Sequence, residues 1–117
     1  MPKVMLIEDD PTMINLLGTL LEMEGFDVVK VTRFENVLAD MKTEMPDVVL
    51  MDVHLNDVDG LTFCAGIRAD AQISSIKVIM SSGMDMRYES IQAGADDFLL
   101  KPYMPDELIN RINGFLG

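Results

Sequence analysis

The sequence predicts an α/β domain in which five parallel strands alternate with five helices. The chain has 117 residues, the usual size of one domain, so residues 1–117 are expected to form a single folding unit. Short apolar runs alternate with segments of helical periodicity from one end to the other. Because several of these runs are apolar on both faces, helices must cover both sides of the sheet. The alternation further implies right-handed crossovers between parallel strands, which is a doubly wound arrangement.

The first strand is expected at residues 4–7, where an unbroken apolar run indicates burial on both faces. Asp10 follows as the expected N-cap of a helix. Pro11 fits its first position, because proline lacks an N–H that the first helical turn would leave unpaired. Apolar residues then recur at helical spacing until Gly25 ends the helix. The first quarter of the chain therefore supplies one strand and one helix.

A second strand and helix follow the same rhythm. Residues 28–31 are rich in valine, which favours a strand. A helical stripe of apolar residues comes next, and it consists of Phe34, Val37, Leu38 and Met41. Pro46 then interrupts the chain, and residues 48–51 form a third strand that is apolar on both faces.

The remaining elements are predicted in the same way. A polar loop ends at Gly60, after which apolar residues at helical spacing begin the third helix. Residues 76–80 form the fourth expected strand, and a short helix is expected at 87–93. Residues 98–100 form the fifth strand, and the apolar positions within 108–115 line a last helix. No linker or repeat divides the chain.

The charge balance excludes several classes of function. Twenty Asp and Glu residues outnumber nine Lys and Arg residues, which gives a formal net charge of −11. Such a surface repels nucleic-acid phosphates and anionic lipids, so we expect no direct binding to nucleic acid and none to membranes. The N-terminus does not resemble a secretory signal, and the single Cys64 can form no internal disulfide. These features predict a cytoplasmic protein.

Side chains with chemical potential gather after the strands. Glu8 and Asp9 follow the first strand, and Asp52 follows the third. Ser82 lies beyond the fourth strand and Lys101 follows the fifth. Ligands of open α/β sheets bind beyond the carboxyl ends of the strands, so these side chains are expected to meet there. A site made of carboxylates, with no cluster of histidine or cysteine, favours Mg²⁺ or Mn²⁺ as its ion. Such a cation, a lysine and a hydroxyl around one aspartate would together stabilise the oxygens of a phosphoryl group, which is what phosphoryl transfer to that aspartate requires.

In these motifs the chain resembles the receiver domain of two-component response regulators, over essentially its whole length. No single motif is decisive, but together they occur in order and at strand ends. They are Glu8-Asp9-Asp10-Pro11, Asp52 with Gly60 eight residues later, Ser82-Gly83, Ala93-Gly94-Ala95-Asp96-Asp97 and Lys101-Pro102. The resemblance implies a flavodoxin-like fold, similar to that of chemotaxis regulators, with the strand order 2-1-3-4-5.

The resemblance also implies a cation site. Asp9 would bind Mg²⁺ directly and Glu8 mainly through water, while Asp52 and the backbone carbonyl of His54 would supply further oxygen ligands. The side chain of His54 has two possible roles. It is either an exposed, inert loop residue, or it overhangs the phosphoryl group and alters hydrolysis in a pH-dependent way.

Further roles follow from the same resemblance. Asp52 would accept the phosphoryl group, and Lys101, followed by a cis peptide bond, would contact a phosphoryl oxygen. Ser82 would hydrogen-bond to the phosphoryl group and draw its loop inward, whereas Ser81 is expected to be a satisfied hydroxyl at the strand end. Phe98 would be the aromatic switch residue that turns inward on activation.

Two features depart from the family pattern. Asn56 stands where proline is usual, four residues after the acceptor, so a looser turn is expected there. The stretch from Ser82 to Lys101 is about one helical turn shorter than usual, so the fourth helix is expected to be short or displaced. With the fifth strand and fifth helix, that helix borders the face through which such domains bind partners. The residues expected on this face are Met84, Met86, Tyr88, Ile91, Tyr103 and Met104.

The expected function is therefore a phosphorylation-activated signalling switch. Its partners would be a sensor histidine kinase or phosphotransfer protein and a downstream protein or output domain. It would not be an enzyme in its own right, although it would assist its own phosphorylation and dephosphorylation. One alternative is a receiver fold that binds a protein constitutively. A flavodoxin-like cofactor binder is disfavoured, because Glu8-Asp9-Asp10 stands where that function needs a phosphate-cradling loop.

Overall fold

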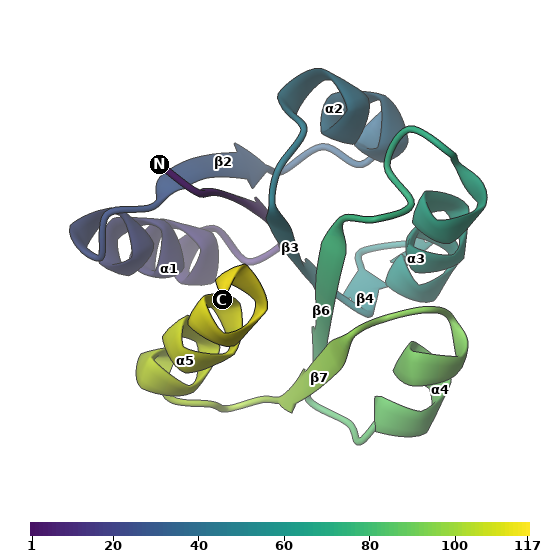
Figure 1. Cartoon of the computed structure of the whole chain (residues 1–117). Coiled ribbons are helices and arrows are strands. Elements are labelled where there is room, and N and C mark those ends of the chain that lie inside the picture. Colours follow the sequence, from purple (N-terminus) through teal and green to yellow (C-terminus); the bar gives the residue numbers. More distant parts are fainter.

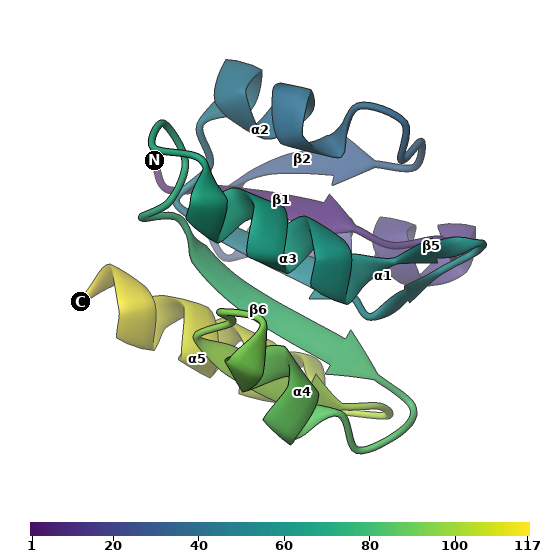
Figure 2. The ribbon, with the colours of Figure 1, turned by 90° about the vertical axis from the view of Figure 1, so that its right-hand side faces the viewer.

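Five parallel strands form the central sheet of the computed structural model, which describes all 117 residues. The strand order is β2-β1-β3-β6-β7, so the predicted order 2-1-3-4-5 is confirmed. Figure 2 shows the arrowheads of β1, β2 and β6 pointing the same way. The strands of this sheet are β1 (Lys3–Ile7), β2 (Asp27–Val31), β3 (Val48–Asp52), β6 (Lys77–Ser82) and β7 (Asp97–Leu100).

Helices cover both faces of the sheet, as Figure 1 shows, and there are five of them. They are α1 (Pro11–Met23), α2 (Val37–Glu44), α3 (Gly60–Ala69), α4 (Arg87–Gln92) and α5 (Pro105–Leu116). Buried residues of α1 and α5 share one hydrophobic cluster, and those of α2 and α3 share the other. Successive β1 residues alternate between the clusters, Val4 and Leu6 in one and Met5 and Ile7 in the other. This explains why the strands are apolar on both faces.

The helix ends follow the local sequence. The carboxylate of Asp10 accepts hydrogen bonds from the backbone N–H groups of Thr12 at 2.9 Å and Met13 at 3.3 Å, which confirms the predicted cap of α1. Asp59 caps α3 in the same way, by accepting from the N–H of Leu61 at 2.9 Å. No helix of the structure has the length and apolar character needed to cross a membrane.

Three local predictions need correction. Phe34 was expected in the second helix, but α2 begins at Val37, and Phe34 reaches the core from the preceding loop. The polar loop before Gly60 contains an unpredicted antiparallel hairpin, formed by β4 (His54–Leu55) and β5 (Val58–Asp59). Ser82 lies within β6 rather than beyond it, because this strand continues to pair with β7 as far as Leu100.

Candidate functional site

Three carboxylates meet at the carboxyl end of the sheet. Glu8 and Asp9 directly follow β1, and Asp52 is the last residue of the neighbouring β3. One carboxylate oxygen from each of the three lies within 4.8 Å of the others. Glu8 and Asp52 are buried, whereas Asp9 is exposed. The parallel pairing of β1 and β3 therefore creates the predicted cluster, with one open side toward solvent.

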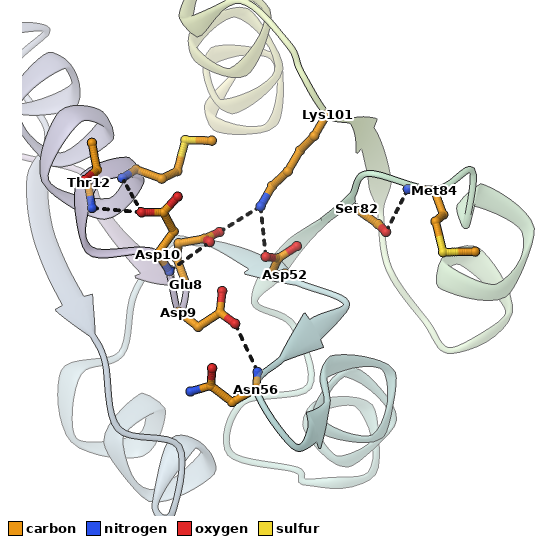
Figure 3. A network of polar contacts seen from close by, with 10 residues as sticks. Glu8, Asp9, Asp10, Thr12, Asp52, Asn56, Ser82, Met84 and Lys101 are labelled. Atoms are coloured by element: carbon orange, nitrogen blue, oxygen red, sulfur yellow. Dashed lines mark hydrogen bonds and ion pairs between the residues drawn. The ribbon is translucent and has the colours of Figure 1, made fainter.

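Lys101, which follows β7, extends across the sheet end to this cluster (Figure 3). Its Nζ lies 2.8 Å from Oδ2 of Asp52 and 3.1 Å from Oε2 of Glu8. The peptide bond between Lys101 and Pro102 is cis, as the resemblance implied. One ammonium faces three carboxylates, so the site keeps an excess of negative charge that a cation would balance.

The site shifts the protonation of its own members. Burial, and then the charge of Asp52, raise the pKa of Glu8 to about 7, although hydrogen bonds from Lys101 and the Asp10 N–H oppose this. Burial opposes the charged form of Lys101, but the hydrogen bond and charge of Asp52, followed by those of Glu8, raise its pKa. The lysine therefore stays charged at neutral pH, and Glu8 takes up a proton more readily than an ordinary glutamate.

Gly60 explains one of the sequence spacings. A Cβ built on Gly60 would lie 2.1 Å from the backbone oxygen of Asp52, so no other residue fits without moving the backbone. The N–H of Gly60 donates to the carbonyl of Val53 at 2.7 Å, and the N–H of Val53 donates to the carbonyl of Ser81 at 2.8 Å. The segment that follows Asp52 is thereby held between β6 and the start of α3.

The β4–β5 hairpin forms the wall of the site beside Asp9. Its turn contains Asn56 in a left-handed conformation, with φ of 53°, and Leu55 before it is fully buried. The backbone N–H of Asn56 donates to Oδ2 of Asp9 at 3.0 Å. The looser turn expected at Asn56 is thus a paired hairpin that contacts the site. The His54 side chain is exposed and lines a shallow pocket with Met86.

The two serines at the end of β6 differ from each other. The hydroxyl of Ser82 accepts a hydrogen bond from the N–H of Met84 at 3.1 Å and contacts no carboxylate. Ser81 was expected to have a satisfied hydroxyl, but its buried Oγ has no hydrogen-bond partner. Phe98 belongs to the hydrophobic core and is 2% exposed, so its ring already lies inward in this structure.

Tyr103 is the residue near the site that the sequence interpretation misplaced. It was expected on the face formed by α4, β7 and α5, but it packs against the cluster between α1 and α5. Its buried hydroxyl has no hydrogen-bond partner. Burial, together with the charges of Glu8 and Asp52, raises the pKa of this phenol. Its position two residues after Lys101 was the only sequence signal that it lies near the site.

Comparison with known proteins identifies the family. The profile of the response regulator receiver domain matches residues 4–113. The chain is 34% identical to the DNA-binding dual master transcriptional regulator RpaA of Synechocystis, over 99% of this chain and 49% of that protein. It is 37% identical to the sensory transduction protein BceR of Halalkalibacterium halodurans, over 97% of this chain and 49% of that protein. The chain thus spans about half the length of these relatives.

Solved structures agree with this result. A response regulator from Chloroflexus aurantiacus is 28% identical, with a TM-score of 0.90 and coverage of 99% of this chain and 98% of that one. The receiver domain of a sensor histidine kinase from Pseudomonas aeruginosa is 25% identical, with a TM-score of 0.88 over 99% of this chain and 98% of that one. That structure holds a magnesium ion in its active-site cleft. The chain belongs to the response regulator receiver domains of two-component systems, which are phospho-accepting signalling switches.

Proposed function

We propose that Asp52 is the phospho-acceptor of this receiver domain and that Glu8, Asp9 and Lys101 complete its reactive site. The observation that carries this proposal is the contact of Lys101 Nζ with Asp52 Oδ2, at 2.8 Å, beside two further carboxylates. A positive group next to a buried carboxylate is what an incoming phosphoryl group requires, because the oxygens of that group become negatively charged neighbours of Asp52.

The carboxylate cluster has the composition of a site for Mg²⁺, or Mn²⁺. All of its donors are oxygens, and their spacing within 4.8 Å suits one cation with water molecules in its remaining positions. We propose that Asp9 and Asp52 bind the ion directly and that Glu8 binds it mainly through water. The backbone carbonyl of His54 would be a further ligand. A bound Mg²⁺ would supply positive charge to the oxygens of the phosphoryl group.

The transfer itself needs little from the protein beyond positioning. One carboxylate oxygen of Asp52 attacks the phosphorus of a phosphohistidine, and an O–P bond forms while the P–N bond breaks. The electron pair of the P–N bond stays on the imidazole nitrogen, which takes up a proton. Lys101 exchanges one carboxylate contact for a phosphoryl oxygen. Dephosphorylation is a separate step in which water attacks the phosphorus. A bond forms between the water oxygen and phosphorus while the bond between phosphorus and the Asp52 oxygen breaks, so the Asp52 carboxylate is restored, inorganic phosphate leaves and the water proton passes to solvent. The same groups around Asp52 would thus assist both its phosphorylation and its dephosphorylation.

We propose that Ser82 and Phe98 report the state of Asp52. The Ser82 hydroxyl is held only by the N–H of Met84, so a phosphoryl oxygen could replace that contact and move the loop after β6. The ring of Phe98 is buried in the hydrophobic cluster against which Met86, from the segment between β6 and α4, also packs. A phosphoryl group would favour the loop position in which Ser82 contacts it and would thereby shift the population of conformers.

The proposed partners follow from the family and from one face of the domain. A histidine kinase or phosphotransfer protein would supply the phosphoryl group. The downstream partner or output domain would bind the face of α4, β7 and α5, where large apolar side chains are exposed. These are Met84, Tyr88, Ile91, Leu100 and Met104. We propose that residues 1–117 form one receiver domain that works in the cytoplasm, where the single buried Cys64 would stay reduced.

The proposal is tested by the intact mass after incubation with acetyl phosphate. One added phosphoryl group is expected with Mg²⁺, and none is expected without Mg²⁺ or in the Asp52→Asn variant. The Lys101→Ala variant should be labelled more slowly, because the ammonium beside Asp52 is lost. Full labelling of Asp52→Asn would overturn the assignment. No adduct, together with no stable beryllofluoride complex, would instead favour a receiver fold that binds proteins constitutively.

A further inference from the structure

The contact between the β4–β5 hairpin and the carboxylate cluster has no part in the function proposed above. The N–H of Asn56 donates to Oδ2 of Asp9 at 3.0 Å, although the two residues are 47 positions apart in the chain. Asp9 is exposed, and this is the hydrogen bond that its carboxylate accepts. Glu8 and Asp52, by contrast, are both buried and held by Lys101.

The turn makes this hydrogen bond possible. Asn56 has φ of 53°, a left-handed conformation that asparagine tolerates better than most residues and that proline cannot adopt. The hairpin fixes the turn, because Leu55 is fully buried and pairs with Val58. Gly60 anchors the far end through its N–H, which donates to the carbonyl of Val53. The N–H of Asn56 is therefore directed at Asp9 by a rigid support.

We propose that Asn56 is a positioning residue for the cation site, and that its backbone N–H holds the Asp9 carboxylate ready for Mg²⁺. This inference rests on the proposed function. Figure 3 shows one oxygen of Asp9 turned to Asn56 and the other on the side of Glu8 and Asp52. Because the hydrogen bond fixes one oxygen of Asp9, the other oxygen already points to the cluster. Cation binding then costs less conformational entropy of the Asp9 side chain than it otherwise would.

Two substitutions test the backbone N–H: one keeps it together with the left-handed turn, and the other removes both. Asn56→Gly keeps the N–H and accepts positive φ, so its Mg²⁺ affinity should match that of the unchanged protein. Asn56→Pro removes the N–H and forbids the left-handed turn, and should weaken Mg²⁺ binding about tenfold. Loss of an outer-shell partner typically costs roughly 10–100-fold, and the exposure of Asp9 favours the lower end of that range. Calorimetric titration of the metal alone measures these affinities.

A second measurement needs no metal. In EDTA, the amide of Asn56 should exchange slowly with deuterium in the unchanged protein and faster in Asp9→Ala. The amide of Gly60, which donates to the carbonyl of Val53, should stay equally protected in the unchanged protein and in Asp9→Ala, which would show that the hairpin is intact in both. Equal exchange of the Asn56 amide with and without the Asp9 carboxylate would overturn the proposal.

The outcomes distinguish this inference from the proposed function. If the unchanged protein binds Mg²⁺ and Asn56→Pro binds it equally well, the positioning role is wrong and the cation site stands. If Asn56→Gly binds as weakly as Asn56→Pro, the asparagine side chain matters and the assignment to its backbone N–H is wrong. If the unchanged protein binds no Mg²⁺, the proposed function itself fails.

Discussion

Replacement of Glu8 by glutamine should stabilise the metal-free protein at neutral pH. Burial and the charge of Asp52 raise the pKa of Glu8 from its ordinary 4.5 to about 7. Between these two values the unfolded chain releases the Glu8 proton while the folded protein keeps it. Folding is therefore favoured by low pH, and this part of the stability is lost as the pH rises through 7.

The size of the effect follows from that shift. Each pKa unit corresponds to about 1.36 kcal/mol, so the ionisation of Glu8 should cost the folded state about 3 kcal/mol between pH 4.5 and 7. The Glu8 side chain is 8% exposed, so solvent screens this cost little. Glutamine has nearly the same shape and no charge. The difference in the free energy of unfolding, Glu8→Gln minus the unchanged protein, should therefore increase by about 3 kcal/mol from pH 4.5 to 7.

Urea denaturation followed by circular dichroism in EDTA, at several values from pH 4.5 to 8, measures the difference. The comparison cancels the contributions of carboxylates remote from Glu8 and leaves those of Glu8 and of Asp52, whose charge acts on it. A difference that stays constant with pH, or that falls as the pH rises, would refute the reasoning. Addition of Mg²⁺ at pH 8 should stabilise the unchanged protein more than Glu8→Gln, because only the unchanged protein has the charged Glu8 carboxylate beside the cation.

Three further substitutions test other parts of the structure. Gly60→Ala should lower the free energy of unfolding by about 1–3 kcal/mol and slow the labelling of Asp52, because the added Cβ would lie 2.1 Å from the Asp52 carbonyl oxygen. Gly114→Ala, which has open space around the added methyl group, is the control. Equal stability of the two variants would contradict the steric argument. Arg68→Ala should lower the free energy of unfolding by about 2–4 kcal/mol, since the Arg68 guanidinium donates to three backbone carbonyls and one carboxylate. A loss below about 1 kcal/mol would show that water replaces these hydrogen bonds. Asp10→Ala should cost about 1 kcal/mol in the same urea assay through loss of the α1 cap, and no change would argue that the cap is irrelevant to stability.

The sheet could be predicted from the sequence because burial on both faces leaves a distinct pattern. Val4 and Leu6 pack toward one layer of helices and Met5 and Ile7 toward the other, so an unbroken apolar run is needed. The position of Asp52 at the carboxyl end of such a run then determined its meeting with Glu8, since adjacent parallel strands end at the same edge.

Other features leave no such pattern. The β4–β5 hairpin has two residues in each strand and is mostly polar, so it is defined by backbone pairing and by the buried Leu55 rather than by periodicity. The hydrogen bond from Asn56 to Asp9 depends on a backbone angle that residue types alone do not specify. Tyr103 was misplaced because it packs against the hydrophobic cluster that α1 and α5 share, and no local signal in the sequence reveals that direction.

The central claim is that Asp52 carries the phosphoryl group. Borohydride reduces an acyl phosphate to the alcohol, so treatment of the phosphorylated protein should convert the modified aspartate to homoserine. Tandem mass spectrometry of the peptides then identifies the position. Homoserine at position 52, formed only after incubation with Mg²⁺ and a phosphodonor, is the predicted result. Homoserine at another aspartate, or a phosphoryl group that resists borohydride because it is not an acyl phosphate, would contradict the account.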